Sequence, residues 1–413
     1  MATVKPFLCI RPNAEVAHRV AALPYDVYNR KEAKQEIERE PLSFLKIDRA
    51  ETNFPDQVDT YDPCVYQKAK ELLETMGKEG VFLQEEQECY YVYELTMEGR
   101  SQTGLVACAS IDDYLDNTIK KHENTREEKE IDRINHVDIC NAQTGPIFLA
   151  YRTHEVINRV VEAVKNEQAL YSFTAVDGIT HRVWRIAAGD RMEAIRKAFC
   201  EIDSIYIADG HHRAASAVKV GIKRRKEHPD YSGSEEFNYF LSVLFPHDQL
   251  MIMPYNRTVK DLNGLSKEEF IQKISENFSV EYLGTVPFAP TSKATFGMYI
   301  KDGWYRLTAK EALRAITDPV AALDVSLLQD YLLQPILGIE DPRTDKRIDF
   351  IGGIRGLKEL ERRVAEDMEV AFSMYPTSIV ELFDVSDAGK LMPPKSTWFE
   401  PKLRSGLFIH RLS

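Results

Sequence analysis

Several side chains that can bind an anion stand together at one point of the chain. They are the consecutive residues Asp209, Gly210, His211, His212 and Arg213, called the DGHHR box below. An apolar strand pattern precedes the box and an alanine-rich helix pattern follows it, so the box opens a helix. A helix N-terminus offers free backbone N–H groups and the positive end of the helix dipole, where cations are normally disfavoured. Two histidines and an arginine there indicate that the box binds an anionic group, most simply a nucleotide phosphate.

Two further properties of the box bear on its chemistry. Asp209 can ligate Mg²⁺ or hold a histidine in one tautomer, and His212 is a candidate catalytic group. The alternative is structural, with Asp209 as an ordinary helix N-cap and both histidines solvated.

The segment 120–136 is the second candidate region, with five cations and five carboxylates. One interpretation is a solvated helix with ion pairs between successive turns. The functional interpretation starts from residues 120–125, where lysines, a histidine and a glutamate are packed together. Its candidates are His122 and Glu123 for catalysis, and Lys120, Lys121 and Arg126 for the carboxylate of a substrate.

The C-terminal run 393–407 is the third candidate region. Its prolines predict an ordered loop, either a strap over the core or a lid that contributes to a nucleotide site. Lys395, Ser396, Thr397 and Trp398 are its candidates for a lid or a clamp on the base, since an indole ring can stack on a base. Lys402 and Arg404 are two further cations of the run.

The elements that must position these residues alternate between strand and helix. Strands are predicted at 88–97, 103–111, 145–151, 181–186, 204–209 and 237–245, and helices at 64–79, 111–136, 154–168, 191–199 and 211–227. Such alternation predicts an α/β fold. We expect three parts, namely an N-terminal lobe over 1–100, a nucleotide-binding core over 101–250 and a C-terminal lobe over 251–413.

Composition narrows the function classes. The chain has 413 residues and a formal net charge of −12, which disfavours a protein whose main partner is nucleic acid. No segment reaches the roughly 20 apolar residues of a membrane helix, and the six cysteines form no close pair. We expect a cytoplasmic protein whose partners are a nucleotide and a small molecule, without a membrane.

The DGHHR box resembles the phosphate-binding box of the ParB/sulfiredoxin superfamily, and within it is most similar to that of the free serine kinases. The resemblance implies a ParB/sulfiredoxin-like core and phosphoryl transfer between ATP or ADP and a small hydroxyl compound, above all free serine or phosphoserine, with Mg²⁺. In those kinases a glutamate upstream of the box is the base on the substrate hydroxyl. Glu123 is the position that matches it, with Glu127 and Glu128 as alternatives.

The whole chain also resembles the domain-of-unknown-function family numbered ten-fifteen. The segments that carry this second resemblance are 23–27, 44–48, 120–125, 208–217, 352–357 and 392–407. Two other functions remain open, a non-catalytic nucleotide-binding regulator and a DNA-binding protein. The acidic composition and the absence of a helix-turn-helix pattern disfavour the second. A histidine in place of a cysteine in the box disfavours a sulfiredoxin-like reductase.

Overall fold

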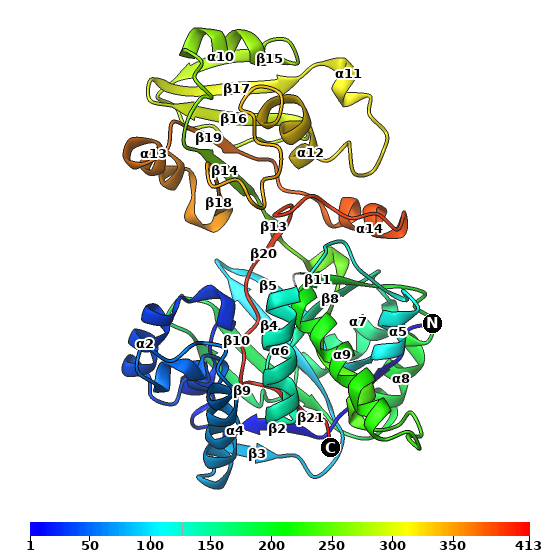
Figure 1. Cartoon of the computed structure of the whole chain (residues 1–413). Coiled ribbons are helices and arrows are strands. Elements are labelled where there is room, and N and C mark those ends of the chain that lie inside the picture. Colours follow the sequence, from blue (N-terminus) through cyan, green and yellow to red (C-terminus); the bar gives the residue numbers. More distant parts are fainter. Residues whose placement is uncertain (126) are drawn as a thin grey trace. The chain divides into compact units, whose positions relative to one another are not determined.

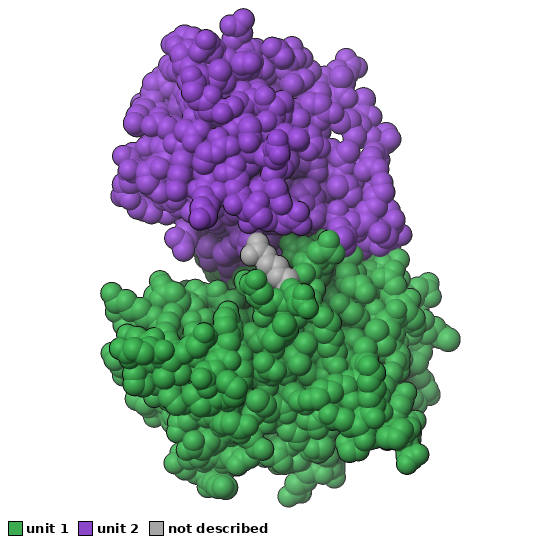
Figure 2. Space-filling view, in the orientation of Figure 1, with its two compact units in different colours: residues 1–250, 401–413 green, residues 251–400 purple. Residues whose placement is uncertain are grey.

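The computed structural model describes residues 1–125 and 127–413 and divides them into two compact units (Figure 1, Figure 2). Unit 1 consists of Met1–Leu250 and Pro401–Ser413, and unit 2 of Met251–Glu400. The expected lobes 1–100 and 101–250 lie in one unit because their strands share one sheet. The last 13 residues, expected in the C-terminal lobe, return to unit 1.

Unit 1 is built on a nine-stranded mixed sheet with the order β6-β11-β8-β12-β5-β4-β10-β9, and β1 pairs with β5 beside this path. Its strands are β1 (Val4–Lys5), β4 (Tyr90–Met97), β5 (Arg100–Ser110), β6 (Ile119–Lys120), β8 (Ile147–Tyr151), β9 (Tyr171–Thr174), β10 (Thr180–Ile186), β11 (Ile205–Asp209) and β12 (Tyr239–Pro246). The predicted hairpin is confirmed as β4–β5. Its two-residue turn places Glu98 and Gly99 at φ +50° and +80°, the left-handed pair that suits the twist of a hairpin.

Some of the helices of unit 1 cover one face of this sheet. The helices of unit 1 are α1 (Ala17–Val20), α2 (Arg30–Arg39), α3 (Leu45–Asp48), α4 (Pro63–Lys78), α5 (Ile111–Leu115), α6 (Glu127–Cys140), α7 (Glu155–Lys165), α8 (Asp190–Phe199) and α9 (His211–Glu227). Apolar residues of α7, α8 and α9 pack with the sheet into one core. On the other face, Tyr91 and Tyr93 contact Phe408 near the C-terminus.

A second sheet ties the two ends of the chain to unit 1. It has the order β3-β2-β21-β7 and consists of β2 (Cys9–Pro12), β3 (Phe82–Gln84), β7 (Ala142–Gln143) and β21 (Ile409–Arg411). Because β2 and β21 pair, the C-terminal segment is fixed within the unit that holds the DGHHR box.

The predicted helix over 111–136 is wrong in its middle. Ser110 caps the short helix α5, and Asn117 adopts a left-handed φ of +67°. The buried Ile119 then pairs in parallel with Ile205 of β11, and α6 begins only at Glu127. The interruption places residues 120–125 next to the strand that leads into the DGHHR box.

Unit 2 carries a six-stranded sheet with the order β15-β17-β16-β19-β14-β18 and a two-stranded ribbon, β13-β20. Its strands are β13 (Ile252–Met253), β14 (Tyr255–Val259), β15 (Phe278–Gly284), β16 (Thr295–Ile300), β17 (Gly303–Ala309), β18 (Ile348–Gly352), β19 (Val370–Ser373) and β20 (Trp398–Phe399), and its helices are α10 (Lys267–Ile274), α11 (Glu311–Arg314), α12 (Asp324–Leu328), α13 (Leu357–Glu366) and α14 (Ile379–Asp387). Trp304 lies at the centre of a core formed with α13. The predicted α/β class is confirmed in both units.

Among the described residues, no helix is long and apolar enough to cross a membrane.

Candidate functional site

The DGHHR box is a strand–turn–helix, as predicted. β11 ends at Asp209, Gly210 turns the chain with φ +93°, and α9 begins at His211 with no side chain capping its first turn. A Cβ atom at Gly210 would lie 3.0 Å from the Arg213 guanidinium. Glycine therefore supplies both the left-handed conformation and the room for Arg213 to fold back over the turn.

Two cations lie against the carboxylate of the box. The Arg213 guanidinium is 3.4 Å and the Lys402 ammonium 3.5 Å from the same oxygen of Asp209. Desolvation would raise the pKa of Asp209, but Lys402 and Arg213 outweigh it and lower the pKa to about 2. Asp209 is thus ionised and holds both cations at the start of α9, where an incoming anion would meet them.

Two buried histidines pack under the turn. The rings of His122 and His211 are edge to face with centroids 4.4 Å apart, and their exposed fractions are 1% and 5%. Desolvation lowers the pKa of His122 to about 4, and desolvation together with His122 lowers the pKa of His211 well below its usual value. Both rings are therefore neutral at physiological pH.

Glu123 lies beside this pair. Its Oε2 is 3.9 Å from Nδ1 of His211, and its side chain is one third exposed. The backbone N–H of His122 donates to Nε2 of His211 at 3.4 Å, which leaves the proton of the neutral ring on Nδ1, facing Glu123. The structure thus brings the predicted base to the predicted phosphate box.

The other candidates of the 120–136 segment are placed differently. The Lys121 ammonium lies 4.1 Å from the centre of the Tyr114 ring and donates to the Tyr114 carbonyl. Lys120 belongs to the edge strand β6. Arg126 lies outside the described residues. Glu127 and Glu128, the alternative bases, are exposed in the first turn of α6.

The C-terminal run divides between the two units. In unit 2, the Ser396 hydroxyl donates to the Pro393 carbonyl at 2.6 Å, Trp398 packs on Tyr255 and Lys395 lies over the same ring. Thr397 is half-buried between them. These contacts describe an ordered strap of unit 2, and the predicted role as a lid or base clamp stays a prediction.

The part of the run in unit 1 holds Lys402 and Arg404, which the sequence offered as cations of a possible site without indicating their partners. Lys402 pairs with Asp209, while Arg404 donates to His181 and pairs with Asp177. Their charge in a proline-flanked loop was visible in the sequence, but their partners lie about 200 positions away and carry no local signal.

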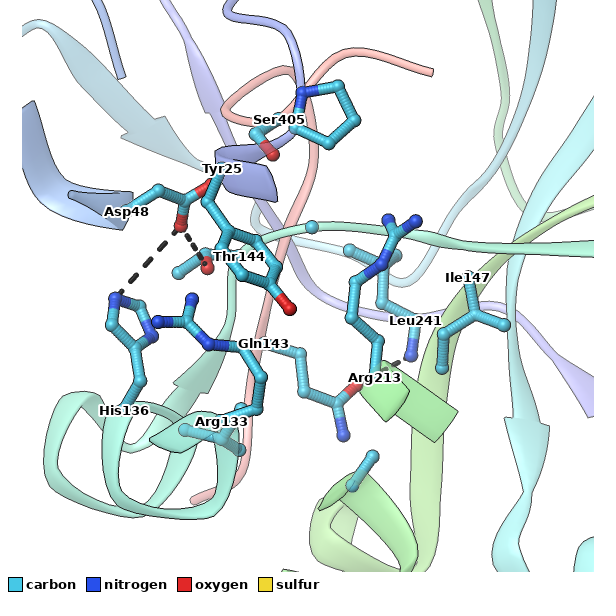
Figure 3. A pocket seen from close by; sticks show the side chains of 14 residues that line it. Tyr25, Asp48, Arg133, His136, Gln143, Thr144, Ile147, Arg213, Leu241 and Ser405 are labelled. Carbon is cyan, nitrogen blue, oxygen red and sulfur yellow. Dashed lines mark hydrogen bonds and ion pairs between the residues drawn. The ribbon is translucent and has the colours of Figure 1, made fainter. Parts of the chain in front are cut away.

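A pocket opens on the other side of Arg213 (Figure 3). Arg213 lines it together with Tyr25, Asp48, Arg133 and His136. Tyr25 and Asp48 belong to the segments 23–27 and 44–48, which entered the sequence interpretation only as marks of family resemblance.

The described residues form no metal site from protein ligands alone. No group of three or more histidines, cysteines or carboxylates among them could hold a metal ion. Asp209, the predicted ligand, already faces two cations.

Together these features define an α/β protein with a cationic helix N-terminus and a carboxylate beside a buried histidine pair. The chain belongs to the family described as "Protein of unknown function (DUF1015)", whose model matches residues 4–326. None of the curated proteins matches the chain.

Among solved structures, the chain is similar to a free serine kinase in complex with AMP, at 16% identity and a TM-score of 0.36 over 73% of this chain and 91% of that one. It is also similar to SbnI with a C-terminal truncation from Staphylococcus aureus, at 12% identity and a TM-score of 0.37 over 71% and 82%. A third is a conserved hypothetical protein from Pyrococcus furiosus, at 15% identity and a TM-score of 0.34 over 73% and 95%.

Proposed function

We propose that unit 1 is a phosphotransferase that binds a nucleotide at the DGHHR box and transfers a phosphoryl group between ATP or ADP and a small hydroxyl compound, free serine in the first place. The observation that carries the proposal is the convergence of Lys402, Arg213 and an uncapped helix N-terminus at Asp209. Phosphoryl transfer needs mainly positioning and neutralisation of charge, which such a set supplies.

The geometry supports the following division of roles. The backbone N–H groups of the first turn of α9, with Arg213 and Lys402, would bind the phosphates. Because both cations are held on an ionised carboxylate, they are placed before the nucleotide arrives. His211 and His122 are neutral, so they would position the loop and Glu123 without adding positive charge.

The proposed chemical step is the transfer of the terminal phosphoryl group to the substrate hydroxyl. The substrate hydroxyl oxygen attacks the terminal phosphorus, and the bond from that phosphorus to the bridging oxygen breaks. The nucleotide leaves with one phosphate fewer. Glu123 accepts the hydroxyl proton, a role within reach of a partly exposed carboxylate.

The test is turnover with isotopically labelled ATP or ADP and a panel of amino acids, with phospho-amino acids followed by mass. Formation of a phospho-amino acid supports the proposal. Tight nucleotide binding without any transfer would instead identify a nucleotide-binding regulator.

A further inference from the structure

Unit 1 contains a cavity of 190 Å³ that the proposed chemistry of the box does not use. It is smaller than the roughly 300–1,000 Å³ typical of drug-sized ligands, so it suits a small metabolite. We call it the tyrosine-lined cavity, after the four tyrosines in its wall, Tyr25, Tyr28, Tyr61 and Tyr66.

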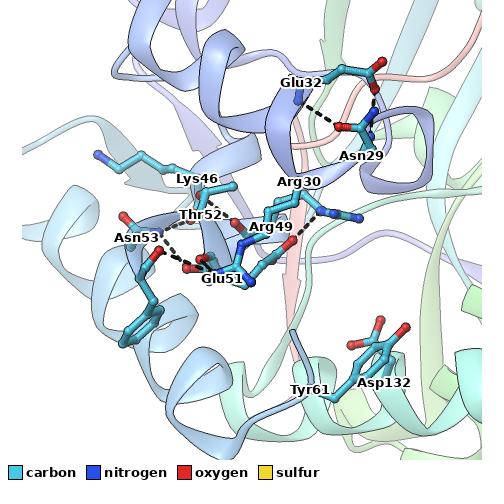
Figure 4. Close-up of polar contacts among 12 residues, drawn as sticks. Asn29, Arg30, Glu32, Lys46, Arg49, Glu51, Thr52, Asn53, Tyr61 and Asp132 are labelled. Carbon is cyan, nitrogen blue, oxygen red and sulfur yellow. Dashed lines mark hydrogen bonds and ion pairs between the residues drawn. The ribbon is translucent and has the colours of Figure 1, made fainter. Parts of the chain in front are cut away.

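The wall of this cavity is held in place by polar contacts (Figure 4). The guanidinium of Arg30 donates to the backbone carbonyls of Glu51, Pro55 and Val58 at 2.7–2.9 Å, which fixes the loop after α3. Asn29 and Glu32 form a capping box at the start of α2. The cavity is thus preformed and does not depend on one mobile loop.

The α6 side of the cavity is equally fixed. Tyr66 donates to Asp132 at 3.0 Å, Arg133 donates to the other oxygen of Asp132 at 2.9 Å, and the Arg133 guanidinium lies 3.9 Å from the centre of the Tyr25 ring. Arg133 is 8% exposed. A buried arginine stacked on tyrosine and anchored on one side is a suitable partner for a carboxylate.

Asp48 supplies the opposite charge. It is 4% exposed and accepts a hydrogen bond from Thr144 at 2.9 Å. His136 lies 4.0 Å away, but desolvation and Arg133 lower its pKa, so this histidine is neutral near pH 7. Asp48 therefore accepts from a hydroxyl and feels the charge of Arg133, but among the described residues no lysine or arginine forms a close ion pair with it. An ammonium group of a ligand would supply that close partner.

The charge of the cavity differs from that of the DGHHR box. Its wall holds four carboxylates and three cations, and it therefore carries a formal charge of about −1 with His136 neutral. The carboxylates are Asp26, Asp48, Glu51 and Asp132, and the cations are Arg49, Lys129 and Arg133. A polyanionic nucleotide does not fit this balance, whereas a zwitterion does.

Arg213 connects the two places. It lines a second cavity of 30 Å³ that shares Tyr25, Asp48, Arg133 and His136 with the tyrosine-lined cavity (Figure 3). A molecule held by Asp48 and Arg133 would therefore lie near the residue that we assign to the phosphate.

We propose that the tyrosine-lined cavity binds the acceptor substrate as a small zwitterion, a free amino acid whose ammonium group pairs with Asp48 and whose carboxylate pairs with Arg133. This inference rests on the proposed function and assigns the substrate class by the charges in the wall. The segments 23–27 and 44–48 then contribute residues that bind the acceptor, and the DGHHR box binds the nucleotide.

The experiment measures the two ligands separately on the full chain. Binding of L-serine is measured by calorimetry with and without ADP, next to ethanolamine, which lacks the carboxylate, and glycolate, which lacks the ammonium. ADP binding is measured alone. The variants are Asp48→Asn, which keeps the shape, and Tyr25→Phe, which removes only a hydroxyl. Asp203→Asn, at an exposed aspartate of the same unit, is the control.

We expect L-serine to bind at least ten-fold more tightly than either truncated compound. We expect Asp48→Asn to weaken serine binding about ten- to a hundred-fold, the usual result of losing a charge-assisted contact, with ADP affinity unchanged. If Asp48→Asn is unfolded by circular dichroism, a several-fold loss of serine affinity in Tyr25→Phe tests the same site.

Unchanged serine affinity in both folded variants would overturn the cavity assignment and leave the proposed function standing. Equal binding of glycolate or ethanolamine would overturn the zwitterion, as would failure of the parent to bind serine in any condition. Failure of the parent to bind ADP, with serine binding intact, would instead contradict the nucleotide site.

Discussion

The two units bury ionisable groups in different ways. Unit 1 gathers them: His122 and His211 pack together under the box, and His181 is held neutral between Tyr93 and Arg404. Unit 2 isolates them: Asp324 is 6% exposed, and both its oxygens accept from one backbone N–H, that of Ala294. Grouped titratable side chains with shifted pKa values are typical of functional sites, and a single buried carboxyl is more often structural. The comparison favours unit 1 as the place of the proposed chemistry.

The largest effect should come from the base. Glu123→Gln keeps the shape but removes the proton acceptor, so turnover should fall by about 10²–10⁴ with little change in nucleotide affinity. The control Glu366→Gln changes an exposed carboxylate of unit 2 and should leave turnover intact. Normal turnover in Glu123→Gln would transfer the role to Glu127 or Glu128, and single-turnover rates measure the difference.

In unit 2, burial raises the pKa of Asp324 to about 7. A carboxyl whose pKa is higher in the folded than in the unfolded state stabilises the fold less as the pH rises from about 4 to 7. The free energy of unfolding should fall over this range by about 4 kcal/mol at most. Asp324→Asn should remove this part of the pH dependence. Trp304 and Trp398 lie in unit 2, so urea unfolding followed by fluorescence in a Trp184→Phe background reports on that unit. Identical pH profiles for both proteins would contradict the raised pKa.

Unit 1 should respond in the opposite direction. The pKa of His122 falls from 6.5 to about 4 on folding. Its contribution to the free energy of unfolding is therefore complete above about pH 6.5 and declines by about 3 kcal/mol as the pH falls toward 4. Asp113, whose pKa is raised to about 6, offsets part of this decline. His122→Phe should therefore be less sensitive to acid than the parent in urea unfolding followed by circular dichroism. If the parent and His122→Phe lost the same free energy of unfolding between pH 7 and pH 5, His122 would not be buried as a neutral ring.

The smallest effect should come from the thiols. All six cysteines are free and lie in unit 1, and Cys64 and Cys200 are the exposed ones. Neither belongs to the box or to the tyrosine-lined cavity, so alkylating them should change ADP affinity by less than about two-fold. A large loss of binding in a folded, alkylated protein would place a thiol in the site.

Local patterns in the sequence predicted most elements of unit 1 and the box itself. The aromatic and β-branched composition of 88–97 predicted β4, and the position of Gly210 predicted the turn into α9. The helix predicted through 116–125 failed because Ile119 is a pairing residue of an edge strand, and nothing local distinguishes it from a helical one. The partners of Asp209 and Arg133 depend on contacts between distant segments, which no single pattern records.

The division of the C-terminal run shows the same limit. Lys395 and Lys402 are seven positions apart in one loop, yet Lys395 lies over Tyr255 in unit 2 and Lys402 pairs with Asp209 in unit 1. The sequence treats them as equivalent cations. Their different surroundings make them a matched pair for testing the box.

The most direct test of the nucleotide site compares the ADP dissociation constants of Arg213→Ala, Lys402→Ala and Lys395→Ala, each shown by circular dichroism to be folded. Loss of a charge-assisted contact of about 1.5–3 kcal/mol should raise the dissociation constant of the first two about ten- to a hundred-fold. Lys395→Ala should lose less ADP affinity than either of them, because Lys395 belongs to the predicted base clamp and not to the DGHHR box. Parent-like affinity in both Arg213→Ala and Lys402→Ala would contradict phosphate binding at the DGHHR box.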